Sequence, residues 1–166
     1  MSKIIVSDAS PLIALAKLDH LELLFCLFSE VHIPNAVYLE TTLTTQRRDT
    51  QRIIEFVKEY DEKQCFIHRD LKDHKYLAFK TRLDEGESQA LALASQLQCG
   101  VLIDERLGRS IAEQHSIPVV GIMGILLQAK AVGKIDLIKP LIDELLLYKY
   151  RLSTRVINIV LQRAGE

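Results

Sequence analysis

Lys3–Leu18, with the sequence KIIVSDASPLIALAKL, joins a short β-branched run to a helical pattern through one acidic residue. The run Lys3–Ser7 is typical of a buried strand, since β-branched side chains pack well on a pleated sheet. Ser10 then has the position of a helix N-cap, and Pro11 that of the first helical residue. This stretch therefore predicts a strand that ends at Asp8 and a helix that begins soon after it.

The alternation of strand and helix continues along the chain. Further strand candidates are Val31–Pro34, Cys65–Ile67, Gly100–Ile103 and Ile117–Ile122. Helical patterns are found over Leu21–Phe28, from Asn35 onward, and over Gln51–Tyr60, Leu71–Leu83, Ser88–Leu97, Glu105–His115, Met123–Ala131, Leu137–Tyr150 and Thr154–Ala164. Strands that alternate with helices predict an α/β fold with a central parallel sheet covered on both faces.

The composition suits one compact domain over residues 1–166. The 21 Lys and Arg residues against 22 Asp and Glu leave a formal net charge of −1, which excludes a protein that grips nucleic acid with its whole surface. No run approaches about 18 consecutive apolar residues, and Asp8 interrupts the N-terminal apolar run, so we expect neither a membrane span nor a signal peptide. We therefore expect a cytoplasmic protein in which Cys26, Cys65 and Cys99 are buried, reduced thiols.

The charges are unevenly distributed along the chain. Residues 1–42 and 84–124 carry a net negative charge, whereas residues 43–83 and 125–166 carry a net positive charge. The acidic blocks also contain strand-like runs, so a fold that brings them together would have an acidic centre and a more basic periphery. A chance distribution over solvated faces would explain the same pattern.

Two acidic residues come directly after predicted strands. Asp8 follows the first strand and Asp104 follows Gly100–Ile103. Both are expected at the carboxyl edge of the sheet, where open α/β folds bind ligands. Glu40 lies in the helix that follows Pro34, so one topology can aim it at the same edge.

Glu87 opens the predicted helix Ser88–Leu97 and shares a face with its apolar residues, so we expect it to point inward. Carboxylates that converge in one crevice repel one another and raise their own pKa values. A hard divalent cation removes that repulsion, and oxygen ligands suit Mg²⁺ or Mn²⁺. Each acid also has an ordinary structural explanation: a helix-terminal anion for Asp8 and Asp104, a capping box for Asp84 and Glu87, and a solvated helix position for Glu40.

Four segments resemble the PIN-domain nucleases. They are VSDASPLIALAKL (6–18), IPNAVYLE (33–40), LDEGESQALALA (83–94) and VLIDERLGRSIAE (101–113). More closely, the chain resembles a group of uncharacterised bacterial and archaeal PIN-like proteins related to VapC toxins, to which the closing stretch Tyr148–Glu166 is also similar.

This resemblance implies a three-layer α/β/α sandwich with a central parallel sheet, and an acidic pocket that holds Mg²⁺ or Mn²⁺ and cleaves single-stranded RNA. Carried over by motif, Asp8, Glu40, Glu87 and Asp104 are the metal-binding and catalytic residues, and Ser10 matches a small polar residue beside the first acid. The resemblance also implies a homodimer and an antitoxin protein as a partner.

Two features depart from the family pattern. Glu87 stands where many members have Asp, and Glu105 directly follows Asp104 where the family often has two acids separated by one residue. Adjacent residues of a regular element cannot both point into one pocket, so Glu105 is expected to lie outside it or to interact with the next helix dipole. RNA also needs positive charge near these acids, and we expect Arg106, together with Ser10, to contact the substrate.

Other basic residues are further candidates for contacts with RNA backbone and bases. A structural interpretation is favoured for each of them, so they stay outside the predicted site. These interpretations are a surface ion pair for Arg109, a solvated loop for Arg47 and Arg48, and a packed helix end for Tyr148–Arg151.

The predicted function is a metal-dependent ribonuclease, the toxin component of a toxin–antitoxin pair. The alternative is a catalytically inert PIN-like binding module or antitoxin partner. Other catalytic motifs such as GxGxxG, GxxxxGK[ST], GxSxG and HExxH are absent from the sequence, and its five histidines show no metal-ligand spacing. A phosphatase of the haloacid-dehalogenase type is disfavoured because its second acid would stand where Ser10 does.

Overall fold

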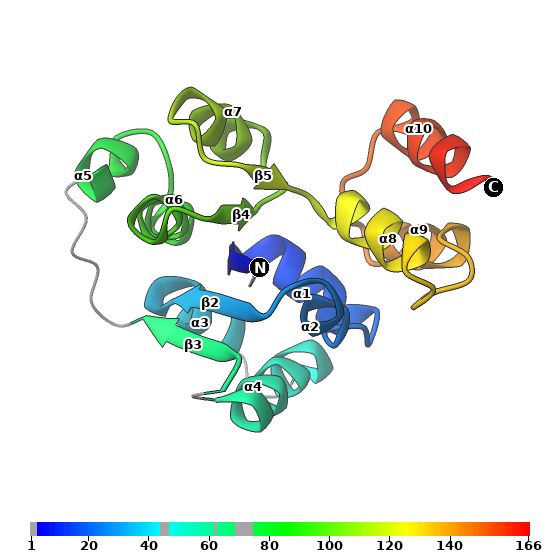
Figure 1. Cartoon of the computed structure of the whole chain (residues 1–166), viewed down its shortest axis with the longest axis horizontal. Coiled ribbons are helices and arrows are strands. Elements are labelled where there is room, and N and C mark those ends of the chain that lie inside the picture. Colours follow the sequence, from blue (N-terminus) through cyan, green and yellow to red (C-terminus); the bar gives the residue numbers. More distant parts are fainter. Residues whose placement is uncertain (1–2, 44–46, 62, 69–74) are drawn as a thin grey trace.

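The computed structural model describes residues 3–43, 47–61, 63–68 and 75–166 (Figure 1). Its strands are β1 (Ile4–Ser7), β2 (Glu30–Pro34), β3 (Cys65–His68), β4 (Gly100–Leu102) and β5 (Val119–Val120). Its helices are α1 (Ala9–Lys17), α2 (Leu23–Leu27), α3 (Asn35–Thr42), α4 (Arg48–Tyr60), α5 (Lys75–Lys80), α6 (Glu85–Leu97), α7 (Arg106–Gln114), α8 (Ile122–Ala131), α9 (Lys139–Leu147) and α10 (Thr154–Ala164).

The strands of the described residues form one parallel sheet in the order β3-β2-β1-β4-β5. The chain leaves β1 toward β2 on one side and later returns to β4 on the other, so the strand order reverses at β1. Parallel sheets bind ligands beyond the carboxyl ends of their strands at such a switch point. A hydrogen bond of 2.9 Å from Asp8 N to Leu102 O joins the ends of β1 and β4 there.

Apolar side chains cover both faces of the sheet. Ile5 and Val31 belong to a core formed with α1, α2, α4, α8 and α9, whereas Val6 and Val101 belong to a second core formed with α5, α6 and α7. Figure 1 shows α8, α9 and α10 together at the end of the molecule opposite α5. This arrangement confirms the predicted three-layer α/β/α sandwich with a central parallel sheet.

The first helix begins before the residue predicted to cap it. Asp8 is the N-cap, with extended backbone angles (φ −80°, ψ 169°), and Ser10 lies inside the first turn of α1. The predicted N-cap role of Ser10 is therefore wrong. Pro11 does not interrupt the helix, because backbone N–H groups of a first turn have no acceptor within the helix.

Two other boundaries differ from the sequence prediction. The last strand is limited to Val119–Val120, because Ile122 already belongs to α8 and Pro118 has no backbone N–H for pairing. The helix predicted over Leu71–Leu83 is described as α5 from Lys75 onward. Residues 71–74, with His74, lie outside the described residues.

Cys26 departs from the prediction of buried cysteines. It is exposed on α2, because this short helix turns Leu23 and Leu24 toward the core instead. Cys65 is buried and Cys99 partly buried, and burial raises the pKa of these thiols to about 12 and about 11, respectively. Both side chains are therefore protonated at neutral pH and serve as packing residues.

Two histidines that are distant in sequence form a hydrogen-bonded pair on neighbouring strands. Nδ1 of His32 on β2 lies 2.7 Å from Nε2 of His68 on β3, and Nε2 of His32 lies 2.9 Å from Oε2 of Glu30. Burial, followed by the neighbouring His32, lowers the pKa of His68. The two side chains therefore pack against each other across β2 and β3.

Candidate active site

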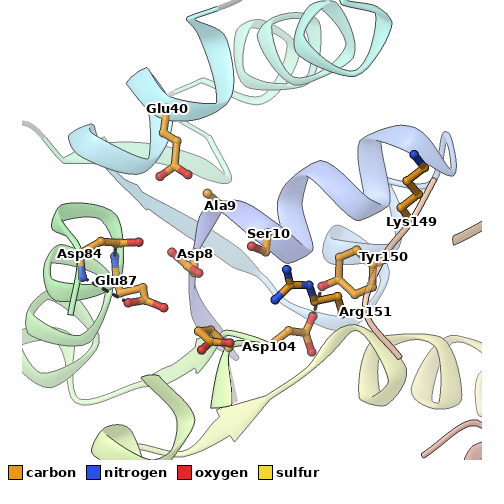
Figure 2. Close-up of a pocket in the computed structure, with 11 residues that line it drawn as sticks. Asp8, Ala9, Ser10, Glu40, Asp84, Glu87, Asp104, Lys149, Tyr150 and Arg151 are labelled. Atoms are coloured by element: carbon orange, nitrogen blue, oxygen red, sulfur yellow. Dashed lines mark hydrogen bonds between the residues drawn. The ribbon is translucent and has the colours of Figure 1, made fainter. Parts of the chain in front are cut away.

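A pocket of about 410 Å³ opens beyond the carboxyl ends of β1 and β4 (Figure 2). Among its lining residues six are acidic and two are basic, so it carries a strong negative charge. The lining consists of Asp8, Ala9, Ser10, Glu40, Asp84, Glu87, Asp104, Glu105, Lys149, Tyr150 and Arg151. We call it the acidic pocket.

Asp8 lies at the centre of the carboxylates and is only 4% exposed. Burial raises its pKa to about 7, and the charges of Glu87, Asp84 and Glu40 add to this rise, while a hydrogen bond from the Ala9 backbone opposes it. Its side chain does not cap α1. Asp8 therefore holds a negative charge at neutral pH only at an energetic cost, which a nearby cation would remove.

Asp84 and Glu87 form a capping box at the start of α6. Glu87 N donates to Asp84 Oδ1 (2.8 Å), and Asp84 N donates to Glu87 Oε2 (3.3 Å). The box starts the helix at Glu85, earlier than the predicted Ser88. Its bonds also hold both carboxylates at the wall of the acidic pocket, where burial and then the charge of Asp84 raise the pKa of Glu87.

Glu40 reaches the acidic pocket from α3. The residue is exposed, but its carboxylate points toward Asp8 and Asp84 (Figure 2). Partial burial, followed by the charge of Asp84, raises its pKa. The carboxylate lies over the first turn of α6, and a Cβ at Gly86 would come within 3.0 Å of Glu40 Oε2. Gly86 thus lets α3 bring its acid close to α6.

Asp104 is anchored by protein donors on the other side of the pocket. Tyr150 donates to its Oδ2 at 2.5 Å, and Ile122 N, at the start of α8, donates to Oδ1 at 3.1 Å and Oδ2 at 3.2 Å. Nη1 of Arg109 lies 4.0 Å from Oδ1. Burial raises the pKa of Asp104, and these three groups oppose the rise. A Cβ at Gly121 would lie 2.5 Å from Oδ1, so the close approach of Asp104 to α8 requires glycine.

The structure places the two predicted substrate-binding residues, Ser10 and Arg106, differently relative to the acidic pocket. Ser10 lies exposed at the pocket wall, whereas Arg106 is exposed on α7 and does not line the pocket. Glu105 lines the rim, where its carboxylate accepts a hydrogen bond from Arg106 N (2.9 Å) and caps α7, as the helix-dipole interpretation predicts. The cations of the lining are Lys149 and Arg151, which belong to the segment that follows α9.

A family model described as a PIN domain matches residues 4–166. The chain belongs to the PIN-domain family. PIN domains are generally nucleases, and they usually bind divalent metal ions. No protein among the curated sequences matches the chain. In the described part of this PIN domain, no helix is long and apolar enough to cross a membrane.

The side chains of this PIN domain supply the donors that a hard cation requires, but they are not gathered around one point. Among the described residues, no group of three or more His, Cys, Asp or Glu side chains is arranged so that it could hold a metal ion. The donor chemistry nevertheless fits Mg²⁺ or Mn²⁺, because the acidic pocket offers carboxylate oxygens and excess negative charge. Binding would require the carboxylates of Asp8, Glu40 and Glu87 to move toward one another.

The site predicted from the sequence leaves out Asp84 and the segment Lys149–Arg151, which line this pocket. The sequence predicts only a capping-box role for Asp84, although its charge acts on Asp8, Glu40 and Glu87. The sequence favours a packed helix end for Tyr148–Arg151, and nothing in it indicates the bond of Tyr150 to Asp104. The spacing Asp84-x-x-Glu87 was a usable signal, because a capping box places two carboxylates side by side at a helix start.

Proposed function

We propose that this PIN domain is a metal-dependent ribonuclease that hydrolyses phosphodiester bonds of single-stranded RNA. The observation that carries the proposal is the buried Asp8, whose pKa is raised to about 7 beside three further carboxylates that act on it. A divalent ion would offset this repulsion, and the family match supports nuclease chemistry.

In this proposal Asp8, Glu40 and Glu87 would hold the ion, and Asp104 lies beyond the end of β4 on the other side of the acidic pocket. A bound Mg²⁺ or Mn²⁺ supplies positive charge that activates water and offsets the charge developing on the phosphate. Asp104 is expected to contribute least to ion binding, since Tyr150 and Ile122 N already donate to its oxygens.

The other side chains of the pocket serve the substrate. The Arg151 guanidinium points into the acidic pocket and Lys149 lies at its edge (Figure 2), so both can offset the repulsion between RNA phosphates and the acids. The exposed hydroxyl of Ser10 is free to orient a water or a phosphate oxygen by a hydrogen bond.

Thermal unfolding with added Mn²⁺ or Mg²⁺ tests the metal site, with Asp8→Asn as the site variant and Asp136→Asn, an exposed acid outside the pocket, as the matched control. We expect the ion to raise the unfolding temperature of the wild type and of Asp136→Asn but not of Asp8→Asn. Cleavage of single-stranded RNA, abolished by a chelator, then tests the activity.

An inert binding module is the second candidate function, and the anchored Asp104 together with the dispersed carboxylates favours it. A wild type that neither responds to the metal ions nor cleaves RNA would support this candidate and overturn the nuclease proposal.

The biological role that we propose is the toxin of a toxin–antitoxin pair, acting as a homodimer, and its support is the resemblance of the four motifs to VapC-related proteins. Expression of the wild type should slow bacterial growth, while expression of Asp8→Asn should not. Light scattering of the purified protein should give the mass of a dimer. Normal growth with the wild type would contradict the toxin role, and a monomeric mass would contradict the dimer.

A further inference from the structure

We propose that a second pocket, next to the acidic pocket, binds the backbone and one base of the same RNA strand beyond the cleaved phosphate. This inference rests on the proposed ribonuclease function. The second pocket has a volume of about 360 Å³ and lies where the end of α1, the start of α4 and the end of α9 meet. It is lined by Lys17, Leu18, Asp19, Arg47, Arg48, Asp49, Arg52, Glu144 and Tyr148.

The two pockets are joined by two continuous stretches of chain. Tyr148 lines the second pocket, and the next residues, Lys149–Arg151, line the acidic pocket. Helix α1 makes the other connection, because Ser10 in its first turn lines the acidic pocket and Lys17 at its end lines the second. At 1.5 Å per residue these ends of α1 are about 10 Å apart, a distance that a short stretch of single-stranded RNA can span.

The ion pairs of the second pocket leave cations available for a ligand. Asp49 Oδ2 is paired with Arg47 Nη2 (3.2 Å) and Asp19 Oδ1 with Arg52 Nε (2.9 Å). Arg52 also donates to Ala16 O (2.7 Å), so it secures the C-terminal end of α1 and is not available to a ligand.

Arg48 and Lys17 are the remaining cations of the second pocket. Arg48 is exposed, and no salt bridge to it is found among the described residues. Lys17 lies with Nζ 5.5 Å from the centre of the Tyr148 ring. The acid left in the lining is Glu144, which accepts a hydrogen bond from the Tyr148 hydroxyl (3.3 Å). The second pocket therefore carries net positive charge beside a pocket of strong negative charge.

Tyr148 adds a surface on which a base can stack. Its side chain is 45% exposed, while Lys17 and Glu144 hold its ring and its hydroxyl. Exposed aromatic rings next to cations are the common means by which proteins bind single-stranded nucleic acids without sequence preference. Arg48, Lys17 and Tyr148 would anchor the RNA strand in the second pocket. Lys149 and Arg151 would guide the strand so that one phosphate stays over the carboxylates of the acidic pocket, despite the repulsion between phosphate and carboxylates.

Fluorescence anisotropy with a labelled single-stranded RNA tests the inference, with Asp8→Asn as the parent protein so that cleavage does not interfere. In this parent, Arg48→Gln and Lys17→Gln should each weaken binding and lower the slope of log Kd against log salt by about 0.7 to 1. Tyr148→Ala should weaken binding about tenfold without a change in that slope. Lys58→Gln, an exposed residue at the other end of α4, is the matched control and should bind like the parent.

An RNA-cleavage assay with the wild type and with variants that keep Asp8 distinguishes this inference from the proposed function. Arg48→Gln should cleave a dinucleotide, too short to reach the second pocket, at the wild-type rate, but should cleave a longer RNA with a raised KM. Wild-type cleavage of long RNA together with unchanged binding in all three second-pocket variants would overturn the inference and leave the ribonuclease proposal standing. Weakened RNA binding in these variants, with no cleavage by the wild type or by any variant, would support the second pocket and overturn the ribonuclease proposal. If the protein neither binds nor cleaves RNA, the second-pocket inference and the ribonuclease proposal are both overturned.

Discussion

The Tyr150 hydroxyl donates a hydrogen bond of 2.5 Å to Oδ2 of Asp104 and so connects the segment after α9 to the carboxyl end of β4. Burial, and next the charge of Asp104, raises the pKa of Tyr150 above its usual range, which keeps its proton available for this bond. The C-terminal part of the chain therefore forms one wall of the acidic pocket and fixes one of its acids.

Tyr150→Phe removes this donor and leaves the half-buried Asp104 carboxylate with fewer partners. Because the acceptor is charged, we expect a loss of about 1.5 to 3 kcal/mol in the free energy of unfolding, measured by urea denaturation at pH 7. Tyr148→Phe, which removes an exposed hydroxyl bonded to Glu144, is the control and should change the free energy by less than about 0.5 kcal/mol. Equal midpoints for Tyr150→Phe and the wild type would contradict the anchoring role.

Asp8 should make the metal-free protein less stable as the pH rises. Its folded pKa of about 7 exceeds the ordinary value of 3.8, so its contribution to stability is fully present below about pH 4 and is lost as the pH rises through 7. Asp8→Asn should therefore stabilise the metal-free protein by about 2 to 4 kcal/mol at pH 8, and the difference should fall between pH 7 and 4.

Thermal unfolding in the presence of a chelator, recorded at several pH values, measures this difference. Asp136→Asn should follow the wild type at every pH, since its side chain is exposed outside the pocket. A difference between Asp8→Asn and the wild type that does not change with pH would show that the charge of Asp8 is not its cause.

Gly121→Ala should destabilise the protein through a direct clash. The new Cβ would lie 2.5 Å from Asp104 Oδ1 and 2.7 Å from Arg109 Nη1, and displacing Asp104 would break its bonds to Ile122 N. We expect a loss of about 1 to 3 kcal/mol by urea denaturation. Gly124→Ala is the matched control inside α8: its Cβ would come no closer than 3.4 Å to Val120 Cγ1, and alanine favours a helix by up to about 1 kcal/mol. Equal losses in both variants would argue against the clash.

Glu166 should stabilise the protein except in strong acid. Its carboxylate accepts hydrogen bonds from Ile138 N (2.7 Å) and Lys139 N (2.9 Å), at the start of α9, and from Lys130 Nζ (2.8 Å). These bonds, led by that from Ile138 N, lower its pKa to about 2. Its contribution is therefore present above the ordinary value of 4.5 and is lost as the pH falls through 2.

Glu166→Gln should accordingly lower the unfolding temperature at pH 7 but have little effect near pH 2. Glu113→Gln, which alters an exposed acid on α7, controls for the loss of one charge. An equal shift at both pH values would contradict a role of the Glu166 charge.

The fold and the location of the acids follow from local features of the sequence. Short β-branched runs that end at Asp8 and close to Asp104, each followed by a helical pattern, predict a parallel sheet with both acids at its carboxyl edge. The spacing of Asp84 and Glu87 predicts a capping box, because its bonds connect residues within one helical turn. Local patterns do not predict the N-cap of α1 correctly, because Asp8, the last residue before the helix, occupies that position instead of Ser10.

The surroundings of Asp104 were decided by the tertiary structure alone. Tyr150 and Ile122 are far from Asp104 in sequence, so no periodicity relates them, and only the packing of α8 and of the segment after α9 brings their donors to its carboxylate. The second pocket likewise depends on three helix ends meeting. Residue spacing along one helix or strand determines which side chains share a face. The distance between elements depends instead on how the whole chain buries its apolar surface. At this site that distance sets the hydrogen bonds and charges that elements distant in sequence bring to a carboxylate.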